Sequence, residues 1–510
     1  MRFREQLAPL AVLVLTALLL AVYSWPVHAA PAGGPRFANT VGVNTHLGGA
    51  RETLDPTLLQ RLAAAGVTFI RNDLTWAAVE QTAGVYDFST TGYDDLVEAA
   101  EANGLTVLLI LDYGNSLYGP AQAVLSDAGR SAFAAFATAA AQRYGGRGHR
   151  WEIWNEPNLP QFWSGDGEGP DPAQYARLVD AAVPALRAAD PQATILAGAT
   201  FMGLPTVVPA IGGVEGLDFL GRLFATGVLA LVNGITVHSY RAEPPETVAM
   251  TVDSVRQLMS AAGRTVPLWS GEWGYSTYDP SAPPTGVNYI PAVTPEQQAS
   301  YAVRMALTNY ELGLAGTVWY DDRDAATPSP GNIEDHFGLM QFDLTPKPAY
   351  QALATLLHLV GASSGSSLPP PESGDHVLEF ATDAGPVTAL WSAGTALWRV
   401  EGHSPTARIL ARDGSDMTPA RLAQGLQLRV SADDGPIYLV GDIAVLAPSH
   451  CAGDCDGDAR VTIDELITAV DVSLDRAALV SCAVADTDAD GAVSVAELVT
   501  AVQNALDGCA

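Results

Sequence analysis

The segment Arg150-Trp151-Glu152-Ile153-Trp154-Asn155-Glu156 is a short β-rich run that becomes polar at its carboxyl end. Seven other runs of this kind occur along the chain, at residues 41–46, 68–73, 105–112, 194–199, 234–240, 266–272 and 316–321. Helical patterns rich in Ala and Leu, such as residues 131–144 and 295–312, lie between them. Eight strands alternating with helices are what a (β/α)8 TIM barrel of the α/β class requires, and we predict one over residues 36–360.

A doubly wound open sheet is the competing interpretation of the same alternation. A dinucleotide-binding sheet of that kind carries Gly-x-Gly-x-x-Gly after its first strand, and this chain does not. Polar residues also stand at the carboxyl ends of nearly every run. In a barrel these ends converge on one face, where active sites are built, so their polarity favours the barrel.

Two of the runs end in glutamate beside aromatic residues. Glu156 follows Trp154 and Asn155 in one run, and Glu272 lies between Trp269 and Trp273 in another. Two carboxylates on opposite sides of one barrel can approach each other across its mouth. Such a pair is the minimum apparatus for cleaving a glycosidic bond.

These motifs resemble those of the clan A glycoside hydrolases, which are retaining enzymes on a (β/α)8 barrel. Asn155-Glu156-Pro157 is similar to their acid/base motif, and Glu272 is similar to their nucleophile. Arg71-Asn72-Asp73-Leu74-Thr75-Trp76 is similar to the second-strand signature of glycoside hydrolase family 39. Phe162-Trp163 and residues 271–275 agree with that family or with its near relatives in family 5.

The resemblance implies a double displacement. Glu272 would attack the sugar carbon, and Glu156 would protonate the leaving oxygen and then deprotonate water. For these roles the pKa of Glu156 must be raised while Glu272 stays ionised. Asn155 is suited to hydrogen-bond the 2-hydroxyl of the sugar. The resemblance implies no cofactor for catalysis.

Other residues are candidate substrate contacts. Arg71 could hold Glu272 charged, or it could pair with Glu152 inside the barrel. His238 and Tyr240 resemble the clan pattern in which the tyrosine contacts the nucleophile, although a strand histidine can also be a core residue. We expect Trp319 to floor the subsite where the bond breaks. Substrate contact and local packing are both open for the residues at other strand ends or in mouth loops, His46, Asp112, Tyr113 and Trp163.

The charge balance excludes some classes of partner. The 510 residues include 26 Lys or Arg and 56 Asp or Glu, a formal charge of −30. A field of that sign repels nucleic acids and anionic membrane surfaces. Hydrophobic residues at 48% and charged residues at 16% indicate a globular chain.

The first 29 residues have the pattern of a signal peptide. Arg2 and Arg4 precede an apolar run at residues 7–23, and Val27-His28-Ala29 offers small residues for cleavage. An uncleaved anchor is the alternative. We expect export to the extracellular space or cell surface, with no membrane association after cleavage.

A second, smaller unit follows the barrel. Residues 361–375 are rich in Ser, Gly and Pro, which indicates a linker. Residues 376–446 alternate apolar and polar positions between turns, which predicts a small antiparallel, sandwich-like β domain. Packing against the barrel is its expected role, with sugar binding as the alternative.

The last 60 residues, 451–510, contain two segments with oxygen ligands at the spacing of calcium loops. The residues at positions 1, 3, 5, 7, 9 and 12 are Asp454, Asp456, Asp458, Arg460 (through its carbonyl), Thr462 and Glu465 in the first loop. In the second loop they are Asp486, Asp488, Asp490, Ala492 (through its carbonyl), Ser494 and Glu497. Each loop leads into a similar helix, so we expect two bound calcium ions.

This tail resembles a type I dockerin, an EF-hand-like module of two loop-helix units. It departs from that family in its glutamates at the twelfth positions and in its cysteines, Cys451, Cys455, Cys482 and Cys509. Four cysteines in one exported module indicate disulfides, and three pairings are open. The implied partner is a cohesin-like protein or a cell surface.

Together these patterns predict a secreted retaining glycoside hydrolase that acts on β-linkages of an extracellular polysaccharide or oligosaccharide, with endo action favoured. The alternative is a non-catalytic carbohydrate-binding surface protein anchored through its calcium module. That alternative would require the loss of one carboxylate, yet Glu156 and Glu272 are both present.

Overall fold

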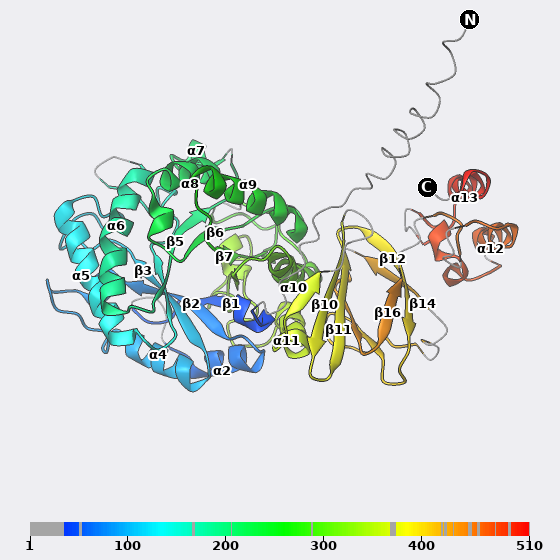
Figure 1. Ribbon diagram of the computed structural model, residues 1–510, viewed down its shortest axis with the longest axis horizontal. Helices are drawn as coiled ribbons and strands as arrows, with labels where there is room; N and C mark the ends of the chain where they lie inside the picture. Colours follow the sequence, from blue (N-terminus) through cyan, green and yellow to red (C-terminus); the bar gives the residue numbers. More distant parts are fainter. Residues whose placement is uncertain are drawn as a thin grey trace, which may run out of the picture.

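The computed structural model contains a barrel, two small sheets and a terminal helical unit (Figure 1). The described residues are 35–49, 54–165, 169–205, 207–286, 289–367, 374–419, 422, 426–431, 433–446, 451–455, 460–474, 476–487 and 491–508. The expected signal peptide, residues 1–29, lies outside them. Within these ranges no helix combines the length and the apolar character needed to span a membrane.

Eight parallel strands close into a barrel in sequence order, which confirms the predicted TIM barrel. They are β1 (Val41–Thr45), β2 (Phe69–Thr75), β3 (Thr106–Asp112), β4 (Arg150–Ile153), β5 (Thr194–Phe201), β6 (Gly234–His238), β7 (Leu268–Trp273) and β8 (Gly316–Trp319). The pairing of β1 with β8, in which Val43 lies opposite Trp319, closes the ring.

Helices surround the barrel. They are α2 (Pro56–Ala64), α3 (Trp76–Val79), α4 (Tyr93–Ala102), α5 (Asp127–Tyr144), α6 (Pro172–Ala189), α7 (Val207–Ala210), α8 (Gly216–Phe224), α9 (Val248–Ala261), α10 (Pro295–Glu311) and α11 (Pro348–Val360). Short 3-10 helices are η1 (Phe37–Thr40), η2 (Val228–Ala230), η3 (Pro245–Thr247) and η4 (Ile333–His336). Asp55, Asp171 and Thr294 cap α2, α6 and α10, each of which begins with proline, so local sequence defines where these helices start.

The barrel interior changes from apolar to charged along its axis. Phe69, Leu108, Leu196, Trp269 and Val318 form an apolar cluster inside it. Two residues beyond Phe69 on β2, and on the same side of that strand, Arg71 forms an ion pair with Glu152 of β4. Because side chains two positions apart lie on the same face of a strand, the interior positions nearer the carboxyl end of the barrel are charged.

The β domain consists of two antiparallel sheets that share one apolar core, as predicted. One sheet has the order β13-β15-β11-β10-β9, with β9 (Gly365–Ser367), β10 (Asp375–Thr382), β11 (Gly385–Ser392), β13 (Arg408–Leu410) and β15 (Ile437–Val440). The other has the order β14-β12-β16, with β12 (Thr395–Gly402), β14 (Leu426–Ser431) and β16 (Ile443–Leu446). Because β9 pairs with β10, this domain begins inside the segment that we predicted as a linker.

Polar contacts hold the β domain against the barrel. The Trp391 indole donates to Glu246 at 3.0 Å, and Arg304 of α10 donates to the same carboxylate at 2.8 Å. His376 pairs with Glu311 at 2.7 Å. These contacts favour packing over an independent sugar-binding role for this domain.

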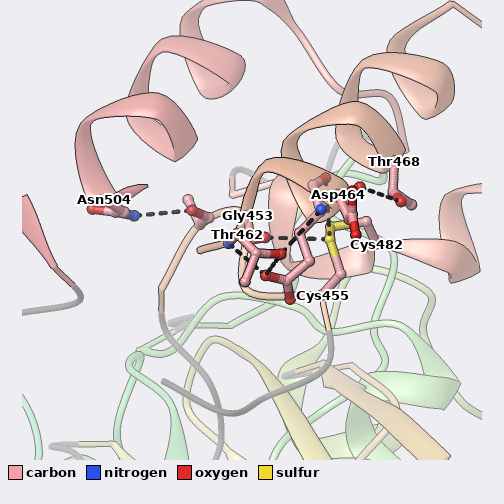
Figure 2. The surroundings of a disulfide bond; sticks show 9 residues. Gly453, Cys455, Thr462, Asp464, Thr468, Cys482 and Asn504 are labelled. Carbon is pink, nitrogen blue, oxygen red and sulfur yellow. Dashed lines mark hydrogen bonds between the residues drawn. A yellow bond between two sulfur atoms is a disulfide. The ribbon is translucent and has the colours of Figure 1, made fainter. Parts of the chain in front are cut away.

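The C-terminal unit contains α12 (Ile463–Ser473), η6 (Leu479–Ser481), η7 (Ala483–Ala485) and α13 (Val495–Asp507). In Figure 1 it lies beyond β14 and β16, on the side away from the barrel. Cys455 and Cys482 form a disulfide beside the start of α12 (Figure 2). Cys451 is also disulfide-bonded, and Cys509 lies outside the described residues.

Candidate active site

Arg71 lies at the centre of the barrel mouth, where it is buried and uses all three of its nitrogens. Nε donates to Glu152 Oε2 at 2.7 Å. Nη1 donates to Glu272 Oε2 at 2.8 Å and to Asn44 Oδ1 at 3.0 Å, and Nη2 donates to Asn155 Oδ1 at 2.9 Å. The sequence left two partners open for Arg71, and the structure shows that it binds both Glu152 and Glu272.

Glu272, at the end of β7, has a donor on each carboxylate oxygen. Arg71 donates to Oε2, and the Tyr240 hydroxyl donates to Oε1 at 2.7 Å. Burial raises the pKa of Glu272, while the Arg71 charge and the Tyr240 hydrogen bond act in the opposite direction. Burial and the Glu272 charge raise the pKa of Tyr240 well above its usual range, so the phenol stays protonated and donates.

Glu156 has a different environment. Its Oε1 lies 2.8 Å from Nδ1 of His238. Burial raises the pKa of Glu156 well above its usual range, and the charge of Glu272 raises it further. Of the two carboxyl groups, Glu156 is therefore the one suited to hold a proton, and Glu272 is the one suited to stay ionised.

The neighbours of His238 define its tautomer. Its Nε2 lies 3.3 Å from Nη2 of Arg71, and an arginine can only donate, so Nε2 accepts. Burial, followed by the Arg71 charge, lowers the pKa of His238 well below its usual range, so the ring is neutral. Its one proton therefore lies on Nδ1 and points to Oε1 of Glu156. This leaves Oε2 of Glu156 as the oxygen suited to carry a transferable proton.

The carboxyl groups of Glu156 and Glu272 and the ring of His238 are close together. One carboxylate oxygen of Glu156, one of Glu272 and a ring nitrogen of His238 lie within 4.8 Å of one another. Three such atoms could hold a metal ion. The Arg71 cation, bonded to Glu272 at 2.8 Å, opposes a second positive charge there, so the set is better suited to proton transfer.

The backbone at Glu156 explains why β4 is shorter than the run that predicted it. The strand ends at Ile153, and Trp154 and Glu156 then have φ values of 69° and 44°. Residues other than glycine rarely adopt this left-handed conformation, and it is concentrated at functional sites. The Glu156 amide donates to the carbonyl of Ala199 at 2.9 Å, which fixes the turn.

Two other predicted residues reach the mouth. The side-chain amide of Asn155 donates to the Tyr113 hydroxyl at 3.3 Å and accepts from Arg71, so its orientation is fixed beside Glu272. His46 lies between two carboxylates, with Nδ1 3.1 Å from Asp73 and Nε2 3.6 Å from Asp321.

Burial decides against the sugar contact expected for Trp319 and favours the packing alternative for Trp163. Trp319 is 2% exposed, packs edge-to-face on Trp273 and donates to the carbonyl of Phe337 at 3.2 Å. Trp163 is 1% exposed and packs against Trp154 and Tyr175. Neither ring offers a face to a sugar, so both contribute to packing.

Sequence reasoning missed several residues of the site. Asn44 lies on β1, two positions before His46, so the two side chains are expected on the same side of the chain. A second polar residue at this spacing in a buried strand was the signal for Asn44. Tyr289 and Tyr320, which pack on Tyr240, and Glu334, which hydrogen-bonds to both, were also missed. Tyr320 directly follows β8 inside the predicted run 316–321, whereas Tyr289 lies in a loop and Glu334 in η4, where no periodic pattern marks them.

The predicted calcium loops are described in part. Asp454, Glu465, Asp486 and Glu497, at the first and twelfth positions, are buried, and Asp456, Asp458, Asp488 and Asp490 lie outside the described residues. Glu465 accepts from the Thr462 amide at 2.7 Å, and Glu497 accepts from the Ser494 amide at 2.7 Å. Arg460 and Ala492 lie in the loops at the seventh position. Buried carboxylate oxygens at both ends of each loop are of the kind that calcium takes as ligands.

Comparison with protein families gives one match. Residues 30–305, more than half of the chain, match the model of the family described as cellulase, glycosyl hydrolase family 5. A comparison with curated proteins found no match.

Solved structures share the fold at low identity. A family 39 glycoside hydrolase from the gut symbiont Bacteroides cellulosilyticus WH2 is 22% identical with a TM-score of 0.62, over 80% of this chain and 82% of that chain. A GH39 β-xylosidase from Caulobacter crescentus is 19% identical with a TM-score of 0.54, over 80% and 96%. A GH30 endoxylanase from Clostridium papyrosolvens C71 is 10% identical with a TM-score of 0.51, over 79% and 96%.

Proposed function

Because the chain belongs to the cellulase family, glycosyl hydrolase family 5, we propose that it is a secreted, retaining glycoside hydrolase of β-linked polysaccharides or oligosaccharides. The observation that carries the proposal is the opposite environment of two neighbouring carboxyl groups. Glu272 receives donors from Arg71 and Tyr240, whereas the pKa of Glu156 is raised by burial and by Glu272 itself.

In the first step a carboxylate oxygen of Glu272 forms a bond to the anomeric carbon as the bond to the glycosidic oxygen breaks. The proton of Glu156 passes to the leaving oxygen, which departs as an alcohol. Oxygens of the two groups within 4.8 Å of each other support direct attack, because inverting enzymes leave about 6.5–9.5 Å for a water molecule.

In the second step a water molecule attacks the anomeric carbon of the glycosyl-enzyme. Glu156, now a carboxylate, takes a proton from this water, and the bond to Glu272 breaks. His238, through its Nδ1 proton, stabilises the carboxylate that Glu156 becomes between the two steps. Asn155, held by Arg71, is in place for the 2-hydroxyl of the sugar.

The remaining proposals concern the tail and the location. The leader pattern of residues 1–29 supports export, and buried oxygen donors support two calcium ions, held through Asp454, Glu465, Asp486 and Glu497 with other residues of each loop. Two calcium ions would offset part of the negative charge of a tail that holds 12 acidic and 2 basic residues.

A partner for the tail is supported by its surface. Large apolar side chains of α12 and α13 are exposed, which is typical of an interaction site such as a cohesin-like or cell-surface partner would cover. A tethered enzyme suits a bound polymer, which is our reason to favour endo action.

A comparison of leaving groups tests the two roles. We expect Glu272→Gln to lose about 10⁴-fold or more of kcat on every substrate, since the nucleophile is gone. Glu156→Gln should lose about 10²–10⁴-fold on natural linkages, but far less in the first step with a dinitrophenyl glycoside, whose leaving group needs no proton.

Glu379→Gln, an exposed change on β10, is the matched control and should behave as the parent. Products read by mass separate endo from exo action. Equal activity of Glu272→Gln and the parent on any glycoside would refute the proposal.

A further inference from the structure

A third carboxylate, Glu334, stands at the barrel mouth outside the catalytic pair. It belongs to η4, in the loop that follows β8. The Ser276 hydroxyl donates to the carbonyl of Ile333 at 2.7 Å, and the Asn332 side chain accepts from the Glu334 amide at 3.4 Å. The backbone that carries Glu334 is therefore fixed to the loop after β7.

The side chain of Glu334 lies on an aromatic layer. The Tyr320 hydroxyl lies 3.5 Å from its Oε2, and the Tyr289 hydroxyl also hydrogen-bonds to it. Both rings pack edge-to-face on Tyr240, with centroids 5.7 and 6.2 Å away, and Tyr240 donates to the nucleophile. Glu334 keeps part of its surface in contact with solvent. The hydration that its carboxylate loses in the mouth, with the charges of Glu272 and Asp321, raises the pKa of Glu334 to about 7.

The topology places Glu334 on the glycone side of the cleaved bond. In the closed barrel β8 neighbours β7, which carries Glu272, and lies opposite β4, which leads to Glu156. Glu156 protonates the leaving group, so the sugar that bonds to Glu272 is the one that faces Glu334. A carboxylate beside tyrosine rings is suited to accept from sugar hydroxyls while a ring packs on the sugar's apolar face.

Two basic side chains of the described barrel mouth, Arg71 and His46, contact other groups. Arg71 donates to Glu152, Glu272, Asn44 and Asn155. His46 lies between Asp73 and Asp321 and packs edge-to-face on Tyr320. A carboxylate on the glycone would meet the carboxylates of Glu334 and Asp321, while Arg71 and His46 contact other groups, and like charges repel each other.

We propose that Glu334 binds hydroxyl groups of the glycone and makes the enzyme reject uronic acids, so that its substrates carry neutral sugars at the cleaved bond. This inference rests on the proposed hydrolase function. It adds a specificity-determining residue and a substrate class to that function.

The test compares sugars that differ at one carbon. The probes are aryl β-glucoside with β-glucuronide and aryl β-galactoside with β-galacturonide, assayed at pH 8, where Glu334 is ionised. We expect the parent to prefer the neutral member at least about 100-fold in kcat/KM. Glu334→Gln should raise KM for the neutral member about tenfold with kcat within about twofold, and narrow the preference at least about tenfold, while Glu379→Gln changes neither.

A parent that prefers the uronide, or a Glu334→Gln variant that keeps the parent's KM and preference, would overturn the inference. Calorimetry of the parent with the free neutral sugars and their uronates makes the same comparison without turnover. Binding of a uronate as tight as that of its neutral counterpart would overturn the inference by itself. Absence of hydrolysis with neutral-selective binding would instead refute the proposed hydrolase and leave the sugar preference standing.

Discussion

Charged side chains are usually exposed and apolar ones buried, and two regions of this molecule, the barrel mouth and the two C-terminal helices, depart from that rule in different ways. The mouth buries charged groups, with Arg71, Glu152, Glu156 and Glu272 all nearly inaccessible. The helices expose apolar groups: of the 14 large hydrophobic side chains exposed in the described chain, eight are on α12 and α13 or end them. Buried charged groups that pair with each other indicate a catalytic or binding site. Apolar side chains that stay exposed to solvent indicate a surface that contacts a partner.

The exposed set forms two equivalent rows, which we call the apolar stripes. Each stripe has the spacing i, i+4, i+7 and i+11, and the second repeats the first 32 residues later. Their members are Ile463, Ile467, Val470 and Leu474 in the first stripe, and Val495, Val499, Val502 and Leu506 in the second. The same helices bury the carboxylates of Glu465 and Glu497, while those of Asp464 and Asp507 are exposed.

The largest stability effect should come from removing the central cation of the mouth. Arg71→Met leaves Glu152 as a buried carboxylate without its partner, and we expect a loss of about 3–5 kcal/mol in the free energy of unfolding, measured with urea. Arg222→Met, whose ion pairs are on the surface, should cost less than about 1 kcal/mol. If the two variants lost equal free energy of unfolding, the stability of the barrel mouth would not depend on its buried ion pairs, and the comparison would fail.

Calcium removal should separate the two regions. With EDTA we expect the melting temperature of the C-terminal unit to fall by about 25–50 °C. Two bound ions together add about 6 kcal/mol at saturating calcium, and each kcal/mol shifts the melting of a small unit by about 4–8 °C. The barrel transition should stay in place, because its charged groups pair with each other. Calorimetric scans with and without calcium measure the melting of both regions. An equal shift of the two transitions would contradict the view that only the C-terminal unit depends on calcium.

Removing one donor at the mouth should change catalysis through pKa. Tyr240→Phe removes the hydrogen bond that lowers the pKa of Glu272, so this pKa rises and the acid limb of the activity profile moves to higher pH. We expect kcat/KM to fall about tenfold or more, the worth of a hydrogen bond to a charged group. An acid limb that does not move would show that Tyr240 does not control the ionisation of Glu272.

The smallest effect should be on the apolar stripes. Ile467, at 56% exposed, loses few contacts in Ile467→Ala, and the free energy of unfolding should change by less than about 0.5 kcal/mol. Val472→Ala, on the buried side of the same helix, should cost about 1–3 kcal/mol. If thermal melts gave equal costs, the stripe would be covered within the folded chain.

The sequence predicted the barrel because eight runs with polar ends follow from alternation along each strand. It predicted Glu156 and Glu272 because strand ends converge on one face. It could not choose between the partners of Arg71, since that depends on which residues of three strands meet inside the ring. The left-handed backbone at Trp154, which ends β4 early, leaves no trace in an apolar pattern.

The errors have a common physical origin. Trp319 lies at the end of β8, but the direction in which its ring points depends on its packing on Trp273. Glu334 was missed because a loop brings it back over the mouth from beyond β8, and loops carry no period. In the tail, the repeat of Asp and Glu positions was visible in the sequence.

The central claim is that Glu272 becomes covalently bonded to the sugar while Glu156 transfers the proton. The most direct measurement is mass spectrometry of the protein after incubation with a 2-deoxy-2-fluoro aryl glycoside of a sugar that it hydrolyses, with peptides then sequenced. The account predicts one added glycosyl mass, located on Glu272, in both the parent and the Glu379→Gln control. An adduct on Glu156, or turnover with inversion and no adduct on any residue, would contradict it.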